Sequence, residues 1–161
     1  AITGTNGKTT TTALLGEIMK AYAKSVFVVG NIGNAYTGAA LSMTEESYTV
    51  AEISSFQLET TMEFHPKVSA VLNITEDHLN RHHTMEEYIR VKEMIAGNQT
   101  KEDFCVLNHE DEELRRFARY VRQKWSSFQA YINWKREFSW TEGRLSCAPG
   151  QRRFWWQRRR S

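Results

Sequence analysis

The chain has 161 residues, of which 40% are hydrophobic and 25% are charged, as in an ordinary soluble globular domain. Its longest apolar run, VFVVG at residues 26–30, is too short to cross a bilayer, and the first residues lack the pattern of a secretory signal peptide. The cysteines Cys105 and Cys147 have no paired spacing, which favours reduced thiols and a cytoplasmic location over a disulfide framework.

The net charge of +2 conceals two unlike segments. Residues 1–124 carry 13 Lys/Arg and 17 Asp/Glu, whereas residues 125–161 carry 8 Lys/Arg and 2 Asp/Glu. All five tryptophans lie in the second segment. We therefore expect a boundary near residue 124, with a basic, tryptophan-rich tail after it.

The first half of the chain predicts helices alternating with strands. Residues 9–23 predict a helix, because Leu14, Ile18 and Tyr22 recur every four residues. Apolar runs without strict alternation, typical of a parallel sheet covered on both faces, predict strands at 25–30, 48–54 and 68–74. A glycine-bounded turn at 30–33 leads into a further helix.

The second half continues the same rhythm. Residues 84–98 predict a helix that begins with a Thr84–Glu87 capping box. Its apolar stripe is formed by Tyr88, Val91 and Ile95. A strand is predicted at 104–108, and a helix with acids first and bases last at 111–123. This alternation indicates an α/β fold with a doubly wound, mostly parallel sheet.

The segment GTNGKTT, residues 4–10, is typical of a phosphate-binding loop. It does not meet the strict G-x-x-x-x-G-K-[ST] signature, because Ile2 stands five residues before Gly7. Two glycines still permit positive φ, so backbone N–H groups at the helix start can turn onto phosphate oxygens. Lys8 would then reach the β- and γ-phosphates and the Thr9 hydroxyl would bind Mg²⁺. The alternative is a plain glycine turn before a polar helix start.

Three further stretches follow predicted strands, where a sheet of this kind binds ligands. GNIG at 30–33 is either a site or a simple tight turn. Glu52, in an apolar strand, must be paired, protonated or metal-bound, because an isolated buried carboxylate is costly. His78 lies near His82 and His83, and surface histidines are usually just solvated.

Lys92 has no predicted ion-pair partner. The positions three and four residues away hold Tyr88, Ile89, Ile95 and Ala96, none of which is acidic. The pattern alone therefore leaves Lys92 unexplained, and a plain solvated lysine is the favoured interpretation.

Taken in order, GTNGKTT, GNIG, EISSFQLE and LNITEDHLNRH…MEEYIRVK resemble the Mur ligase family, the ATP-dependent amide ligases that build the peptide stem of bacterial cell-wall precursors. The most discriminating stretch, EISSFQLE, is most similar to the member that adds D-glutamate to UDP-N-acetylmuramoyl-L-alanine. The resemblance covers about residues 1–122. It implies part of the central ATP-binding domain, with its P-loop, of a cytoplasmic bacterial ligase that acts as a monomer.

The resemblance also implies a role for each motif residue. The ATP-binding residues would be Gly4, Thr5, Asn6, Gly7, Lys8, Thr9 and Thr10. Lys8 would contact the terminal phosphates, and Thr9 would bind Mg²⁺.

The remaining roles fall on four residues outside the loop. Glu52 would be a magnesium ligand, His78 a magnesium-linked residue near the substrate, and Asn31 a contact to the muramoyl substrate. Lys92 would carry a carbamate that supports a second Mg²⁺. Lys8, His78 and Lys92 would be the catalytic residues.

The implied reaction begins when the substrate carboxylate attacks the γ-phosphate of ATP, forming an acyl phosphate. The amine of D-glutamate then displaces phosphate and leaves an amide. Positioning and charge neutralisation are the main demands of such a reaction. Since the family's uridine-binding and amino-acid-binding domains have no counterpart here, we expect a piece of a larger enzyme that is inactive alone, with the adenine-binding and D-glutamate-binding residues outside it.

The tail that ends in GQRRFWWQRRRS has three interpretations. It binds nucleic acid or acidic lipid, since Arg and Trp suit phosphates and stacking; it is a diverged, strand-rich end of the domain; or it is an out-of-frame or truncated translation. The abrupt change in composition favours the last, so neither nucleic acid nor a membrane is expected as a partner. Rival functions are a sister ligase that adds another amino acid, a nucleotide-binding module without ligase activity, and a nucleic-acid-binding protein.

Overall fold

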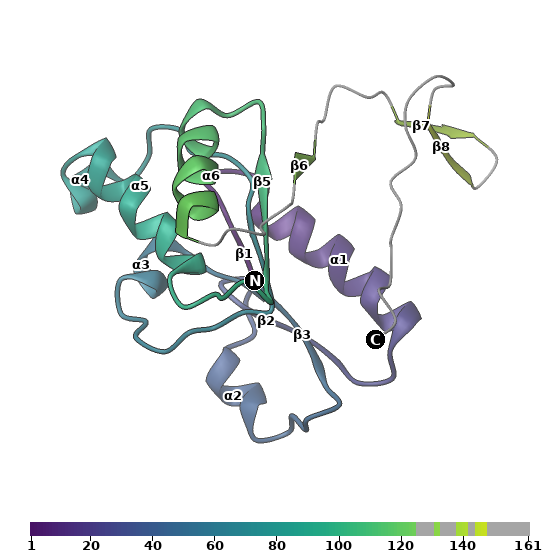
Figure 1. The fold of residues 1–161 in the computed structure, drawn as a ribbon. Helices are drawn as coiled ribbons and strands as arrows, with labels where there is room; N and C mark the ends of the chain where they lie inside the picture. Colours follow the sequence, from purple (N-terminus) through teal and green to yellow (C-terminus); the bar gives the residue numbers. More distant parts are fainter. Residues whose placement is uncertain (125–130, 133–137, 142–143, 148–161) are drawn as a thin grey trace.

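The structure is a computed structural model that describes residues 1–124, 131–132, 138–141 and 144–147. A six-stranded parallel sheet forms its centre, in the order β2-β3-β1-β4-β5-β6 (Figure 1). The strands are β1 (Ile2–Thr3), β2 (Val26–Gly30), β3 (Tyr48–Glu52), β4 (Val68–Val71), β5 (Phe104–Asn108) and β6 (Tyr131–Ile132). A separate antiparallel pair is formed by β7 (Phe138–Thr141) and β8 (Arg144–Cys147).

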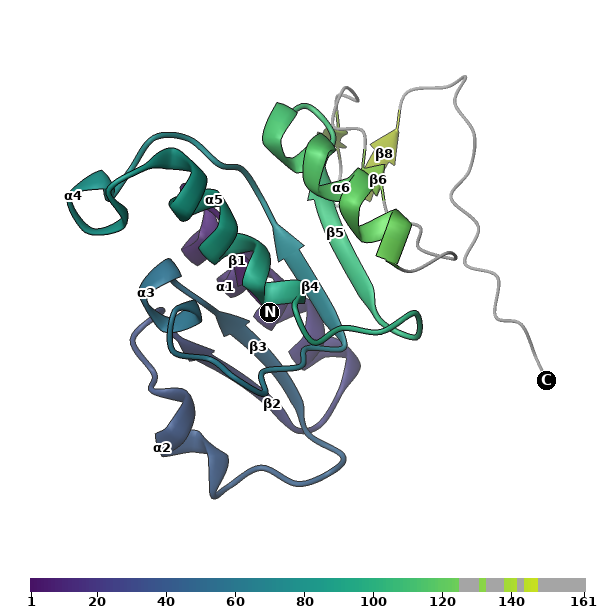
Figure 2. The ribbon, with the colours of Figure 1, turned by 60° about the vertical axis from the view of Figure 1, so that its left-hand side comes forward.

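Helices connect the strands and lie on both faces of the sheet. Figures 1 and 2 show α1 on one face, with α5 and α6 on the other. The helices are α1 (Lys8–Tyr22), α2 (Tyr36–Ala40), α3 (Ser55–Leu58), α4 (Leu79–His82), α5 (Met85–Glu93), the 3-10 turn η1 (Met94–Ala96) and α6 (Glu112–Lys124). The predicted α/β fold with a parallel sheet is therefore confirmed. The short β1 lies between β3 and β4, so the loop after it stands in the middle of the sheet.

The main core lies between the sheet and the α5–α6 layer. Val71 and Leu107 of the strands pack there with Tyr88, Val91 and Ile95, so the stripe predicted for this helix is buried as expected. On the opposite face α1 approaches the sheet closely at Gly16, where an added Cβ would lie 2.5 Å from a methyl carbon of Val28.

The apolar stripe predicted for α1 does not face the core. Leu14, Ile18 and Tyr22 are 62%, 55% and 75% exposed, whereas the buried residues of the helix are Thr12 and Gly16. Only small side chains fit between a helix and a sheet that are this close, so the large residues point away. The helix was predicted correctly, but the residues used to predict it do not form its buried face.

The predicted capping box of α5 forms only in part. Thr84 Oγ1 accepts the Glu87 N–H at 3.2 Å, but the Thr84 N–H donates to the carbonyl of His82. The Glu87 carboxylate instead lies 3.4 Å from Arg90. A complete capping box forms instead at the start of α3, between Ser54 and Gln57. The sequence had suggested only a ligand site in this stretch.

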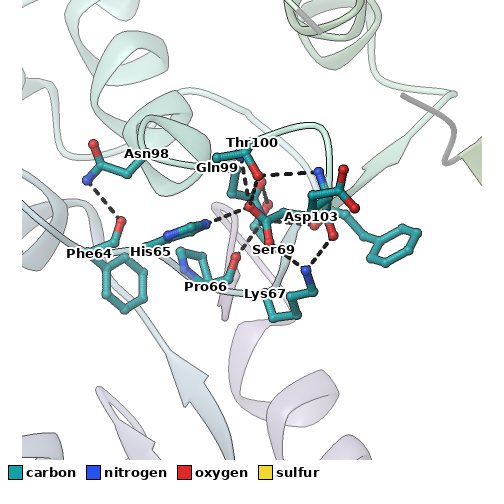
Figure 3. A network of polar contacts seen from close by, with 11 residues as sticks. Phe64, His65, Pro66, Lys67, Ser69, Asn98, Gln99, Thr100 and Asp103 are labelled. Atoms are coloured by element: carbon teal, nitrogen blue, oxygen red, sulfur yellow. Dashed lines mark hydrogen bonds and ion pairs between the residues drawn. The ribbon is translucent and has the colours of Figure 1, made fainter. Parts of the chain in front are cut away.

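A closed polar network holds the amino ends of β4 and β5 together, as Figure 3 shows. Asp103 Oδ2 lies 2.6 Å from His65 Nε2 and accepts from the backbone N–H of Thr100 at 2.7 Å and from its hydroxyl at 3.0 Å. Oδ1 accepts from Lys67 Nζ at 3.1 Å. The hydrogen bonds from His65 and Thr100 hold the pKa of Asp103 well below its usual range.

Gln99 extends this network into the sheet. Its side-chain oxygen accepts from the buried Ser69 hydroxyl, and its amide nitrogen donates to the carbonyls of Pro66 and Phe104. None of the buried side-chain nitrogen or oxygen atoms of this network is without a hydrogen-bond partner.

Among the described helices, none has both the length and the apolar character required to span a membrane.

Candidate functional site

The loop between β1 and α1 has the backbone of a phosphate cradle. Gly4 has φ 148° and Gly7, at the start of α1, has φ 80°. A Cβ at Gly4 would lie 3.1 Å from Leu72 Cβ, so both conformation and space require glycine there. The N–H groups of the first helical turn have no intrahelical acceptor and carry the positive end of the helix dipole. The arrangement suits an anion.

Asn73, just beyond β4, fixes this loop. Its side-chain oxygen accepts the Asn6 N–H at 2.8 Å, and its amide nitrogen donates to the Asn6 carbonyl at 3.0 Å. The Asn73 carbonyl accepts the Thr5 N–H at 2.9 Å. The sequence analysis did not single out Asn73, because its contacts depend on β4 lying next to β1, which the sequence does not report.

Lys8 folds back over its own loop. Its Nζ donates to the carbonyls of Gly4 and Thr5, both at 3.0 Å. Thr9 and Thr10 follow at the exposed start of α1. The one cation of the GTNGKTT segment therefore lies over the loop that the sequence assigned to phosphate.

Glu52 ends β3 next to β1, where it is paired in register with Ile2. It is 1% exposed. Oε1 accepts from Asn31 Nδ2 at 2.8 Å, whereas Oε2 is buried and has no hydrogen-bond partner. A buried carboxylate oxygen without a partner is costly, so Oε2 has the capacity to accept a hydrogen bond or to bind a cation.

The GNIG segment is a tight turn that also shapes the site. Gly30 has φ 97°, and a Cβ there would lie 2.1 Å from the Glu52 carbonyl oxygen. The Glu52 carbonyl accepts the Asn31 N–H at 2.9 Å, and Gly33 N–H donates to Gly30 at 3.3 Å. The two interpretations of this segment are compatible, because the turn brings Asn31 onto Glu52.

Lys92 is buried, so the interpretation as a solvated lysine is wrong. It is 1% exposed, donates from Nζ to the Gly4 carbonyl at 3.0 Å, and lies 4.7 Å from the centre of the Tyr88 ring. Burial, with a smaller contribution from the charge of Lys8, lowers its pKa to about 8, and Asp77 opposes this shift. A lysine with this pKa is neutral in about a tenth of molecules at pH 7.

Tyr88 connects Lys92 to the loop. Its hydroxyl lies 3.2 Å from Thr5 Oγ1, which accepts the Thr75 N–H at 3.0 Å and donates to the Thr75 carbonyl at 3.1 Å. Because the Thr5 proton is used on Thr75, the Tyr88 hydroxyl is the donor to Thr5. Burial raises the pKa of Tyr88 and keeps it protonated. The sequence analysis treated Tyr88 as a core residue only.

His78 stands at the start of α4 in a left-handed conformation, with φ 52°. Its side chain is 46% exposed and lies 3.4 Å from Asp77. Its ring is 5.0 Å from that of Phe56 and 6.5 Å from that of Tyr88. His82 of the same helix is buried instead, so the predicted histidine cluster separates into unlike members.

The structure thus brings several of the predicted residues together. Lys8 and Lys92 meet at the Gly4 carbonyl, Asn31 pairs with Glu52, and His78 reaches Lys92 through the Tyr88 ring. In the described part of the chain, no group of three or more His, Cys, Asp or Glu side chains is placed to hold a metal ion. A cation here would depend on Glu52 Oε2 together with ligands of other kinds.

Comparison with known proteins identifies the family to which this chain belongs. The Mur ligase middle domain matches residues 2–154. The chain belongs to the Mur ligase family. UDP-N-acetylmuramoylalanine–D-glutamate ligase of Lachnospira eligens is 71% identical over 118 residues, which are 73% of this chain and 26% of that protein. The Clostridioides difficile protein of the same name is 62% identical over 117 residues, again 73% of this chain and 26% of the relative.

The chain therefore spans about a quarter of the length of these curated relatives. Among solved structures, MurF from Acinetobacter baumannii aligns with a TM-score of 0.63 at 21% identity, over 85% of this chain and 33% of that one. A UDP-N-acetylmuramoyl-L-alanyl-D-glutamate–2,6-diaminopimelate ligase aligns with 0.56 at 19%, over 80% and 30%. At these identities the structures support the fold alone.

The family match extends beyond residue 124, where the sequence predicted a boundary. That boundary stays a prediction. The suggested out-of-frame origin and lipid or nucleic-acid binding of the tail concern residues that lie largely outside the described ones.

Proposed function

We propose that this chain is the ATP-binding part of a UDP-N-acetylmuramoylalanine–D-glutamate ligase. The observation that carries the proposal is the convergence at the end of β1. Two positive-φ glycines open the loop, the ammonium groups of Lys8 and Lys92 meet at the Gly4 carbonyl, and Glu52 has a buried oxygen without a partner. Phosphoryl transfer needs positioning and charge neutralisation more than covalent participation by the protein, and Lys8 with the start of α1 supplies positive charge here.

In this proposal residues 4–10 bind the phosphates of ATP. Nucleotide binding draws Lys8 Nζ from the Gly4 and Thr5 carbonyls onto the terminal phosphates. The Asn73 contacts can hold the loop tip while this happens, because they use the Asn6 N–H and carbonyl and the Thr5 N–H, none of which bonds to Lys8. Gly7 keeps the first helical turn open to the anion.

Mg²⁺ fits the buried oxygen of Glu52. Carboxylate and hydroxyl oxygens are the ligands that magnesium prefers, and Thr9 and Glu52 supply both. His78 is the proposed magnesium-linked residue, and Lys92, as a carbamate, the proposed support for a second ion. The metal would neutralise charge that develops on the transferred phosphoryl group.

Lys92 suits the carbamate role by its surroundings. It is buried, it has no carboxylate within ion-pair distance in the described part of the chain, and its Nζ already lies beside the phosphate loop. Carbamylation would replace the buried cation by an anion at that position. Asn31, held on Glu52, is the proposed contact to the muramoyl substrate.

The choice of D-glutamate rests on the names of the relatives at 71% and 62% identity, which favour it over a sister ligase for another amino acid. The reaction would join D-glutamate to UDP-N-acetylmuramoyl-L-alanine through an acyl phosphate. The parent protein would be a cytoplasmic monomer, as the resemblance implied.

A chimeric enzyme tests this proposal. The aligned 118-residue segment of the Lachnospira eligens relative is replaced by the matching residues of this chain, and phosphate release is measured with ATP and UDP-N-acetylmuramoyl-L-alanine. We expect D-glutamate-dependent release, with the D-glutamate-binding residues supplied by the relative, and loss of release in a Lys8→Ala chimera. A folded chimera that releases no phosphate would contradict the ligase function.

A further inference from the structure

His82 is a buried histidine that uses both ring nitrogens. Nε2 lies 3.0 Å from Ser55 Oγ and Nδ1 lies 3.2 Å from Glu59 Oε1. Ser55 begins α3 and Glu59 follows it, whereas His82 ends α4. One imidazole therefore ties together the two short helices that follow the strands on either side of β1.

The partners of His82 define its tautomer. The Glu59 carboxylate only accepts hydrogen bonds, so Nδ1 carries the proton. Nε2 then accepts from the Ser55 hydroxyl, whose proton has no other acceptor in the described part of the chain. Glu59 is held in turn by Arg81, at 2.7 Å. The ring of His82 is thus fixed in position and in rotation.

This fixed ring supports both aromatic neighbours of His78. Phe56 stacks on His82 with ring centres 5.8 Å apart and planes 18° apart, and the Tyr88 ring centre is 5.1 Å from His82. Phe56 and Tyr88 are also the rings that contact His78. His78 itself is half exposed, and α4 has no side-chain hydrogen bond at its start. Apart from its contacts with the neighbouring Asp77, the orientation of His78 depends on rings that His82 holds.

We propose that His82 is a positioning residue that sets the orientation of His78 toward the phosphate loop. This inference rests on the proposed function, in which His78 is linked to the metal beside ATP. His82 touches neither metal nor nucleotide. It acts through Phe56 and Tyr88, and Ser55 and Glu59 keep it in place.

NMR line broadening on binding of Mn²⁺-ATP to the 161-residue chain tests this inference. Mn²⁺ broadens the NMR signals of nearby nuclei steeply with distance, so the imidazole signals of His78, assigned with a His78→Gln variant, report how close that ring lies to the ion. In the wild type we expect His78 to broaden most and His65, at the opposite end of the sheet, to remain sharp. In His82→Phe, which retains a ring but loses both hydrogen bonds, we expect the broadening of His78 to fall by about twofold or more. Mn²⁺-ATP affinity should remain within about twofold of the wild type, because the phosphate loop is unchanged.

Two further variants separate positioning from folding. Glu59→Gln keeps an acceptor for the Nδ1 proton and should retain the broadening of His78, whereas Glu59→Ala should lose it. His83→Asn changes the exposed residue that directly follows α4 and should leave the signal unchanged.

Unchanged broadening of His78 in a folded His82→Phe that binds Mn²⁺-ATP would overturn the inference. If His82→Phe does not fold, equal broadening in Glu59→Ala and Glu59→Gln would overturn it. A wild-type chain that binds no Mn²⁺-ATP, or whose His78 signal stays sharp when it does, would instead overturn the proposed function, and this inference with it.

Discussion

The two ends of the sheet treat buried charge in opposite ways. At the amino end of β4 and β5, both oxygens of Asp103 are occupied by His65, Lys67 and Thr100 (Figure 3). At the carboxyl end, Glu52 has one oxygen without a partner, and Lys92 has one backbone carbonyl and the face of an aromatic ring.

This difference distinguishes a buried polar group whose hydrogen bonds stabilise the fold from one that still has an oxygen free to bind a ligand. A fully satisfied buried network tightens the structure, and a partly satisfied one weakens it unless something else completes it. Buried polar groups are rarely left unpaired in native proteins. The incomplete end is therefore the place to expect phosphate and metal.

The largest effect should come from breaking the Asp103 network at the amino end of β4 and β5. Asp103→Ala leaves the backbone N–H of Thr100 and the side chains of His65 and Lys67 without their acceptor, so we expect the free energy of unfolding to fall by about 3 kcal/mol. Chemical denaturation measures it. Glu102→Ala, whose side chain is exposed, is the matched control and should change little. A loss below about 1 kcal/mol in Asp103→Ala would mean that this network does not hold the fold.

The same carboxylate should give an acid dependence of known sign. Its pKa in the fold lies below the ordinary value of 3.8, so the unfolded chain binds the proton more tightly. Its contribution is fully present above about pH 5 and is lost as the pH falls toward its pKa in the fold. The difference in unfolding free energy between wild type and Asp103→Asn should therefore shrink from pH 5 downward. A difference that stays constant or grows would contradict the assignment.

Removing a buried charge from the carboxyl end of the sheet should instead raise the free energy of unfolding. Lys92→Met deletes a buried cation, and the Gly4 carbonyl keeps the hydrogen bond from Lys8. We expect the free energy of unfolding at pH 7 to rise by about 1 kcal/mol. Lys101→Met, at an exposed position, is the control. A destabilised Lys92→Met would show that Lys92 serves the fold, which would remove the contrast between the two ends.

The smallest effect should come from Tyr88→Phe, which removes one hydroxyl group. Loss of its hydrogen bond to Thr5 should lower the free energy of unfolding by about 0.5 kcal/mol. It should also weaken Mg-ATP binding, since Thr5 belongs to the phosphate loop. Calorimetric titration measures that affinity, with Tyr120→Phe, an exposed tyrosine on α6, as control. Unchanged affinity would mean that the hydroxyl does not position the loop.

Much of the fold could be predicted from local pattern. The predicted helices and strands lie within a few residues of those observed, because apolar runs and glycine turns mark where an element begins and ends. The exposed face of α1 could not be predicted, since Leu14, Ile18 and Tyr22 have the spacing of a buried stripe. The closeness of the sheet at Gly16 decides which face turns inward, and that is a tertiary property.

The candidate site was predicted mainly through its motifs. Pattern alone indicated a solvated Lys92, because the group it meets is the carbonyl of Gly4, 88 residues away in sequence. Asn73 and His82 were missed for the same reason. Their partners are set by which strands lie next to β1, and no spacing within one element reports that.

Thermal unfolding with and without Mg-ATP, for the wild type beside Lys8→Ala, tests the central claim that the incomplete end binds nucleotide. At about 100 times its dissociation constant, Mg-ATP should stabilise the wild-type chain by about 2.7 kcal/mol. Lys8→Ala should fold and show little of this shift. No shift in the wild type, or an equal shift in Lys8→Ala, would contradict the account.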